Sequence, residues 1–347
     1  MALKAAAAKG DLVVVDQLLA SKGIDVNGNY DACRWLGHEY INRKYTEDCD
    51  SDTSSLSDTA LATVSEEAAL RNAAGAGHAA IVTALLAAGA DVNVSTKRYG
   101  YTPLLCACSQ GHAHTVMALL TAEGIDVNQP GGFYPIGIQE WFGGWEAPTP
   151  EAGRGQPRYR AAEWPYHSAH TPLIRAAAEG HTSIVTALIA TEGIEVNRAV
   201  THGFTALMEA CYAGHADVVT ALLTAEGIDA NTAADDGSTA LTLAAHACSA
   251  SIVSALLRSR VVHVNATTAD GSTALILAAR KGNAETVNTL LVVEGIDVNV
   301  MDVGGDTAIV WATRKGHSET VDAGRMQRDH CQAADCRYKH GARFGSA

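Results

Sequence analysis

The chain has 347 residues, a net charge of −13, 32 glycines and a composition that is 47% hydrophobic but only 5% aromatic. This combination favours many short helices packed through small side chains, and the negative charge argues against a broad nucleic-acid-binding surface, which needs basic residues. No apolar run approaches the roughly 18 residues of a membrane span, and residues 12–15 are too short and too closely flanked by aspartates for a secretion signal, so we expect neither membrane insertion nor secretion.

Most of the chain consists of copies of one segment, whose clearest copy reads TALMEACYAGHADVVTALLTAEGIDAN over residues 205–231. The separations between the closing asparagines are 66, 35, 69, 34, 34 and 34 residues, and these asparagines are Asn27, Asn93, Asn128, Asn197, Asn231, Asn265 and Asn299. A period of this length is typical of one repeat domain rather than of several independent cores. The two doubled separations indicate two extra segments.

In the copy at residues 102–128, two short helices are predicted on either side of a glycine. The first helix places Leu104, Ala107 and Cys108 on one face. Thr102 precedes this helix, and its hydroxyl can accept a hydrogen bond from a free backbone N–H. Gly111 is predicted to end the helix in a left-handed conformation, which glycine adopts without steric cost.

The second helix of this copy is predicted to begin at His112 and to turn Val116, Leu119 and Leu120 toward the core. Asn128 begins the turn into the next copy. We expect its side chain to bond local backbone and its own backbone to tolerate a left-handed conformation.

The pattern T-P/A-L, then A-A or A-C, G-H, V-V or I-V, A-L-L and G-I-D-V-N resembles the ankyrin repeat. The resemblance covers the seven copies and a degenerate eighth at about residues 306–326. It implies an all-α solenoid of stacked antiparallel helix pairs, with finger-like hairpin loops and a concave groove that binds other proteins without catalysis. It also marks asparagines such as Asn128 as candidate substrates of hydroxylation.

Histidine and cysteine positions within the repeat favour structural roles. Cys108 and Cys211 stand where other copies have alanine, so they are predicted to be buried thiols in a reducing compartment, the cytoplasm or nucleus. Five histidines recur at the start of the second helix and are predicted to be structural, and these are His78, His112, His181, His215 and His317. The sixth copy has Cys248 and Ser249 in place of G-H, which predicts a strained turn.

The extra segments are predicted to be insertions in finger loops, at about residues 28–65 and 129–169, within a repeat domain spanning residues 1–326. For the first segment a decayed repeat is the alternative, because Gly37, His38 and Ile41 imitate part of the pattern. The segments hold 12 of the 19 aromatic residues. Aromatics of the second segment that we select as partner-binding candidates are Trp141, Phe142, Trp145 and Trp164, although anchoring the loop to the scaffold would also explain them.

The ordinary fingers are the second candidate surface. The basic or aromatic candidates on two fingers are Lys97, Arg98, Tyr99, Tyr101, Arg198, His202 and Phe204. Later fingers carry Asp235, Asp236, Asp270, Asp302 and Asp306, so the fingers change from basic to acidic along the chain and could orient a charged partner. The simpler explanation is that aspartate and glycine favour turns.

Two segments resemble metal-binding sites in part. Asp48, Asp50 and Asp52 are spaced like the start of a calcium loop, but Thr53 and Thr59 stand where such a loop needs glycine and glutamate, and the serines and threonines around them favour a disordered, phosphorylated loop. In the tail, residues 327–347, the spacing from Cys336 to His340 resembles half of a CCCH zinc finger. The zinc ligands would be His330, Cys331, Cys336 and His340, but two upstream cysteines are missing, so a disordered tail without metal is favoured.

The sequence therefore predicts a monomeric, non-catalytic scaffold for a partner protein, with no small-molecule substrate, cofactor or membrane association. No motif of a hydrolase, a phosphate-binding loop or a metalloprotease is present. The alternative is an RNA-binding adaptor that uses a zinc-binding tail.

Overall fold

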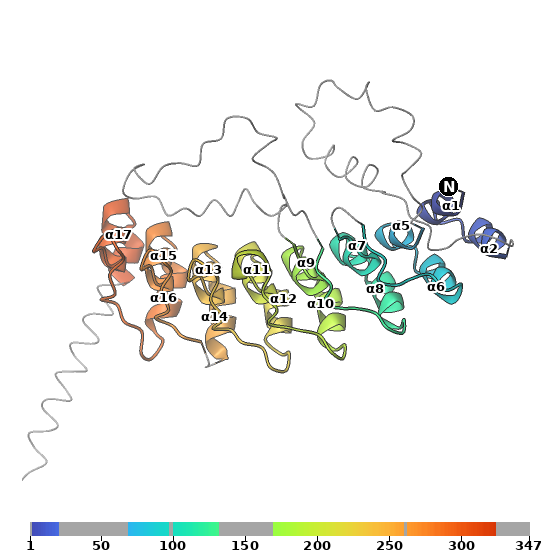
Figure 1. Ribbon diagram of the computed structural model, residues 1–347. Helices are drawn as coiled ribbons and strands as arrows, with labels where there is room; N and C mark the ends of the chain where they lie inside the picture. Colours follow the sequence, from blue (N-terminus) through green and yellow to red (C-terminus); the bar gives the residue numbers. More distant parts are fainter. Residues whose placement is uncertain (1, 21–68, 97–99, 132–168, 260–261, 324–347) are drawn as a thin grey trace, which may run out of the picture. The chain divides into compact units, whose positions relative to one another are not determined.

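The computed structural model describes residues 2–20, 69–96, 100–131, 169–259 and 262–323. Within these ranges the chain forms short helices joined by tight turns, with isolated β-bridges and no strand, which confirms the predicted all-α fold (Figure 1). The described residues belong to two compact bodies that meet in sequence between residues 195 and 196.

The described part of the first body contains four helix pairs. They are α1 (Ala2–Lys9) with α2 (Leu12–Ala20), α5 (Ala69–Gly75) with α6 (Ala79–Ala87), α7 (Pro103–Gln110) with α8 (Ala113–Leu120), and α9 (Pro172–Ala178) with α10 (Thr182–Ile189). The first helices contact one another in the order α1, α5, α7, α9, and the second helices in the order α2, α6, α8, α10. Each pair thus buries its apolar side against the next pair.

The second body repeats this arrangement. Its described helices are the 3-10 helix η3 (Thr201–Gly203), α11 (Ala206–Ala213), α12 (Ala216–Leu222), α13 (Ala240–His246), α14 (Ala250–Arg258), α15 (Ala274–Lys281), α16 (Ala284–Leu291), α17 (Ala308–Lys315) and a last helix at 318–323. The first helices α11, α13, α15 and α17 contact one another in that order (Figure 1).

Neither doubled separation interrupts the stack of the first body. The α1–α2 pair lies directly against α5–α6, and α7–α8 lies directly against α9–α10. No helix pair stands between them in the described part of the chain. Residues 28–65, including the possible repeat around Gly37, lie outside the described residues.

Buried aliphatic side chains form the core of each body. The second helices place a leucine with 0% exposure at the same position in successive copies, as at Leu85, Leu119 and Leu188. Truncation of such a leucine to alanine costs about 2–5 kcal/mol. Ile276 on α15 is 1% exposed, whereas Val310, at the same position on α17, is 39% exposed. The difference arises because no further helix pair covers α17 in the described residues.

The predicted helix ends are confirmed in the copy at residues 102–128. The Thr102 hydroxyl accepts a hydrogen bond from the Leu105 N–H at 3.1 Å, and Pro103 occupies the first turn, where it removes no helical hydrogen bond. Gly111 ends α7 with φ 77°, in the left-handed region. Equivalent threonines accept in the same way at Thr171, Thr205, Thr239 and Thr273.

Histidines at the start of the second helices join neighbouring copies, which confirms a structural role for those with a described contact. His112 Nε2 lies 3.0 Å from the carbonyl oxygen of Gly75 in the preceding copy. The same ring covers Gly77, where an added Cβ would lie 2.7 Å from His112 Nδ1. Glycine is therefore needed at this position for its positive φ of 80° and for the close approach of the ring.

The closing asparagines bond the next copy, so the prediction of a local bond was wrong. Asn93 Nδ2 donates to the carbonyl oxygen of Gly124 at 2.8 Å, and Asn93 Oδ1 accepts from the Asp126 N–H at 2.8 Å. The local turn is held by aspartate instead, since Asp91 accepts from the Asn93 N–H at 2.9 Å. None of the described asparagines has a positive φ. Stacking places the next turn within reach of the amide, and the period alone does not show this.

The strained turn predicted in the sixth copy is present. Cys248 has φ 60°, one of two non-glycine residues with a positive φ in the described chain. The Asn283 side chain donates to the Cys248 carbonyl oxygen at 2.8 Å, which ties this turn to the next copy. Cys248 therefore adopts the left-handed backbone conformation that glycine has in other copies, and its Cβ gives this conformation a steric cost.

Candidate functional site

Each described finger is closed at its base by a backbone hydrogen bond. The residue three positions after the asparagine pairs with the residue before the capping threonine, as in Val200 N–H to Phe204 O at 3.1 Å. The Gly131–His170 pair is equivalent and bonds in both directions at 2.9 Å. The second doubled separation thus leaves the base of this finger intact and places residues 132–169 between its two sides.

His170 is buried at this finger base. It is 2% exposed, and its Nδ1 has no hydrogen-bond partner among the described residues. Burial, together with the positive charge of Arg175, lowers the pKa of His170 from 6.5 to about 3. The ring is therefore neutral at physiological pH, and it acts as a largely apolar side chain at the position that Phe204 occupies in the next finger.

The predicted partner-binding residues are only partly within the described ranges. Tyr101 and Phe204 lie at finger bases and are half-buried, Arg198 is half-buried, and His202 is exposed with φ 64°. Those outside the described residues are Lys97, Arg98, Tyr99, Trp141, Phe142, Trp145 and Trp164, and the tail residues His330, Cys331, Cys336 and His340 lie outside as well. Of the described candidates, Arg198, His202 and Phe204 belong to one finger, and Tyr101 belongs to another.

The finger aspartates have a structural use. Asp236, Asp270 and Asp302 each accept a hydrogen bond from the backbone N–H two residues later, at 2.9, 3.1 and 2.9 Å. Burial alone would raise the pKa of Asp270, but hydrogen bonds from Thr268 and Ser272 and the charge of Arg280 bring it below its ordinary value. These carboxylates hold the turns, as their preference for such positions leads one to expect.

A column of polar side chains on the second body was not singled out by the sequence reasoning. Tyr212, His246, Arg280 and Arg314 occupy the last turns of α11, α13, α15 and α17 at intervals of 34 residues. The rings of Tyr212 and His246 are stacked with centroids 6.5 Å apart. Applying the 34-residue period to the first helices, rather than to the fingers alone, would have found this column.

Trp311 on α17 lies among the cations at one end of the column. Its ring centroid lies 5.5 Å from Arg280 Cζ, 5.3 Å from Arg314 Cζ and 6.0 Å from Lys315 Nζ. These distances are within the range of cation–π attraction. We call Arg280, Lys281, Trp311, Arg314 and Lys315 the basic-aromatic cluster.

Finger aspartates fix part of this cluster. The Trp311 indole N–H donates to Asp302 Oδ2 at 2.7 Å. Arg280 lies 3.6 Å from Asp270, and Arg314 forms a two-pronged ion pair with Asp306. The acidic fingers and the basic helix ends therefore meet at one place, and the row of fingers alone does not describe the charge of this surface.

The electrostatic effect of the cluster reaches the neighbouring copy. Burial, with the charges of Lys281 and Arg280, lowers the pKa of His246 to about 4. Burial and then the charge of Glu209 raise the pKa of Tyr212. Both rings are thus neutral at pH 7, so the column presents two neutral rings followed by cations.

The described residues contain no group of three or more His, Cys, Asp or Glu side chains placed to hold a metal ion. Burial raises the pKa of the Cys108 and Cys211 thiols well above the ordinary value, and both are 0% exposed, which confirms the predicted buried slot and leaves them unreactive.

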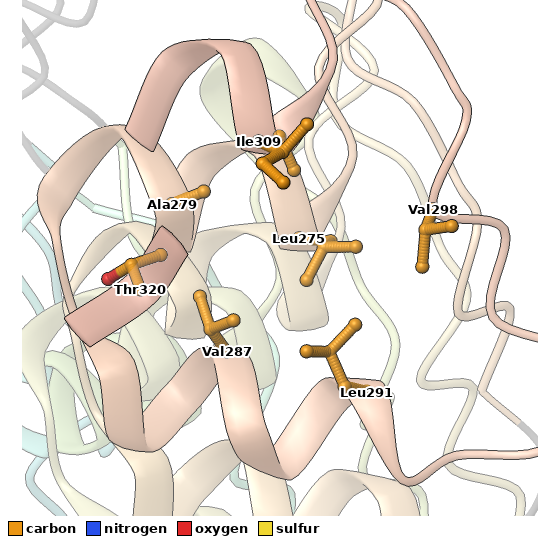
Figure 2. Close-up of a pocket in the computed structure, with 8 residues that line it drawn as sticks. Leu275, Ala279, Val287, Leu291, Val298, Ile309 and Thr320 are labelled. Carbon is orange, nitrogen blue, oxygen red and sulfur yellow. The ribbon is translucent and has the colours of Figure 1, made fainter. Parts of the chain in front are cut away.

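One cavity lies between α15, α16 and α17, and Figure 2 shows its apolar lining. The lining residues are Leu275, Ala279, Val287, Leu291, Val298, Ala308, Ile309 and Thr320. Because the Thr320 hydroxyl is the single polar side-chain group there, the cavity has no acid, base or nucleophile of the strength that catalysis needs.

Comparisons with known proteins address the fold and the family. A family model described as "Ankyrin repeats (3 copies)" matches residues 1–130, 160–234 and 226–302. The crystal structure of the human ASB11 ankyrin repeat domain is similar with a TM-score of 0.57 and 24% identity, covering 86% of this chain and 99% of that one. No curated protein matches the sequence. None of the described helices is long and apolar enough to cross a membrane.

Proposed function

This chain belongs to the ankyrin-repeat family, and from that premise we propose that it is a non-catalytic scaffold that binds a partner protein. Ankyrin repeats are generally protein-interaction modules. The observation that supports a binding surface here is the column from Tyr212 to Arg314 with Trp311 beside it. These side chains change from tyrosine to histidine to arginine along a repeated backbone, and each is at least partly exposed.

Three parts of the chain are proposed to contact the partner. The first is the column on α11, α13, α15 and α17. The second is the finger residues Lys97, Arg98, Tyr99, Tyr101, Arg198, His202 and Phe204. The third is the aromatic part of the second insertion, with Trp141, Phe142, Trp145 and Trp164, because large rigid aromatics contribute most to interface energies. The protein would act as a monomer in the cytoplasm or nucleus.

The finger geometry supplies a specific test of the third part. Val200 and Phe204 are joined by only three residues, Thr201, His202 and Gly203, whereas the equivalent Gly131 and His170 are joined by residues 132–169. Replacing residues 132–169 by Thr-His-Gly should therefore give an ordinary finger. We expect the variant to unfold at a temperature close to that of the full chain.

We then compare the partners that affinity purification captures with the full chain and with this variant. Loss of a partner from a folded variant supports recognition by the insertion. An unchanged set of partners contradicts it, and a collapse in stability shows that the insertion supports the scaffold instead.

A further inference from the structure

The basic-aromatic cluster contains two cations without a carboxylate partner. Lys281 and Lys315 end α15 and α17 at the same position of successive copies, and both are exposed. Among the described residues, no carboxylate lies within ion-pair distance of either lysine, whereas Arg280 and Arg314 are paired with Asp270 and Asp306. In a chain of net charge −13 these two lysines form a local excess of positive charge.

The remaining members of the cluster are held in place before any partner arrives. The Arg280 side chain is 11% exposed and pinned between Asp270 and Trp311, while the Arg314 side chain keeps 54% exposure despite its pair with Asp306. Trp311 is fixed by its hydrogen bond to Asp302 and is half-buried. A fixed surface loses little side-chain entropy on binding, which favours affinity.

We propose that the basic-aromatic cluster binds an acidic, extended peptide segment of the partner protein. This inference rests on the proposed scaffold function and names the chemistry of the segment that the second body would recognise. Carboxylates of the segment meet Lys281 and Lys315, and its backbone crosses α15 and α17 beside Trp311.

The spacing of the lysines limits the sequence of the segment. Packed helices lie about 8–10 Å apart, and the lysines occupy equivalent positions on two such helices. An extended chain in the polyproline II conformation advances about 3.1 Å per residue and completes a turn every three residues, so side chains three residues apart lie on the same side of it. Carboxylates three residues apart therefore match the two lysines, as in a D/E-x-x-D/E pattern.

The neighbouring aspartates favour a peptide over a nucleic acid. Asp270, Asp302 and Asp306 lie beside the arginines and the tryptophan of the cluster. A nucleic-acid strand carries a phosphate at every nucleotide and would bring some of them against these carboxylates. A peptide can place its two charges at the lysines and neutral residues elsewhere.

The test is a selection of random peptides displayed on phage against the full-length chain. Peptides enriched by the wild type are synthesised, and their dissociation constants are measured for the wild type and for a Lys281→Ala/Lys315→Ala double variant. The matched control is Lys9→Ala, because Lys9 is also exposed and occupies the equivalent last position of its first helix, α1. Unfolding temperatures of all three proteins confirm that they are folded, and a labelled single-stranded RNA is titrated in parallel.

We expect enriched peptides with carboxylates three residues apart, bound at least 10-fold more weakly by the double variant and equally well by the Lys9 variant. Binding of these peptides should also weaken as salt is added. The proposal of an acidic segment is contradicted if the enriched peptides are neutral or basic, or if the double substitution does not change their binding. Either result leaves the proposed scaffold function unaffected. RNA binding that depends on the two lysines would also contradict the acidic segment, and failure to enrich any peptide counts against the scaffold function itself.

Discussion

The side-chain amide of Asn128 donates a hydrogen bond to the carbonyl oxygen of Gly193 at 2.7 Å, although 65 positions separate the two residues. The Asn128 Oδ1 also accepts from the Glu195 N–H at 2.9 Å. Asn93 makes the same two bonds across 31 and 33 positions. The link between consecutive copies is therefore the same whether or not an insertion lies between them.

Replacing Asn128 by alanine removes both bonds between consecutive copies. Because each is worth about 0.5–1.5 kcal/mol net, we expect Asn128→Ala to lower the free energy of unfolding by about 1–3 kcal/mol in urea titrations. Asn288 is exposed on α16, and Asn288→Ala should change stability little. Equal stability of the two variants would show that the asparagine link contributes nothing.

Two glycines have nearly the same backbone conformation but different surroundings. Alanine substitutions at these positions therefore distinguish the cost of the left-handed backbone from the cost of a steric contact. Gly77 and Gly214 have φ 80° and 82°. An added Cβ at Gly77 meets the His112 ring at 2.7 Å, whereas at Gly214 it meets nothing within 4 Å. We expect Gly214→Ala to cost about 1 kcal/mol, which is the penalty of a left-handed alanine less the gain from a less flexible unfolded chain, and Gly77→Ala to cost distinctly more. Thermal unfolding of the two variants makes the comparison, and equal losses would mean that the ring moves aside freely.

The turn at Cys248 can be relieved by glycine. Its φ of 60° costs a residue with a Cβ about 1–2 kcal/mol, so Cys248→Gly should raise the free energy of unfolding, by about 1 kcal/mol after the greater flexibility of glycine in the unfolded chain is counted. Cys248→Ala keeps the strain and removes the thiol, so it should give no such gain. A gain for both variants would point to the thiol as the source of the instability.

The neutral His170 makes the stability of the first body depend on pH. Its folded-state pKa of about 3 lies below the ordinary 6.5. As the pH falls below 6.5, His170 is therefore protonated in the unfolded chain while it stays neutral in the folded chain. The contribution of His170 to the free energy of unfolding is thus complete above pH 6.5, and it falls by up to about 1.4 kcal/mol per pH unit toward pH 3.

Phenylalanine is the matched replacement, because Phe204 occupies the same finger position. We expect His170→Phe to lose less stability than the wild type between pH 7 and pH 5 in urea titrations. His246, whose pKa is also lowered, titrates in both proteins and leaves the difference unaffected. Parallel losses of the two proteins would show that His170 is protonated in the folded state.

The helices and the buried positions could be predicted from the sequence because they depend on residues close together in the chain. Thr102 caps a helix through the N–H three residues later, and Gly111 ends it through its own φ, so a single copy contains the whole argument. The hydrogen-bond partner of the Asn128 side chain could not be predicted in this way, because backbone groups of its own turn and of the next copy are both possible partners for its amide. The basic-aromatic cluster was missed because its members look like ordinary helix ends when each copy is read alone.

The sequence by itself determined that this protein is a series of helix pairs, with their ends, their apolar faces and the two places where the period doubles, since all of these follow from periodicity and local hydrogen bonding. Only the tertiary structure decided that Asn128 bonds Gly193, that Gly131 and His170 close a finger, and that Trp311 lies beside Arg280 of the preceding copy. The physical reason is that stacking brings together groups about 30 residues or more apart, and their distances follow from the packing of neighbouring copies rather than from any one copy.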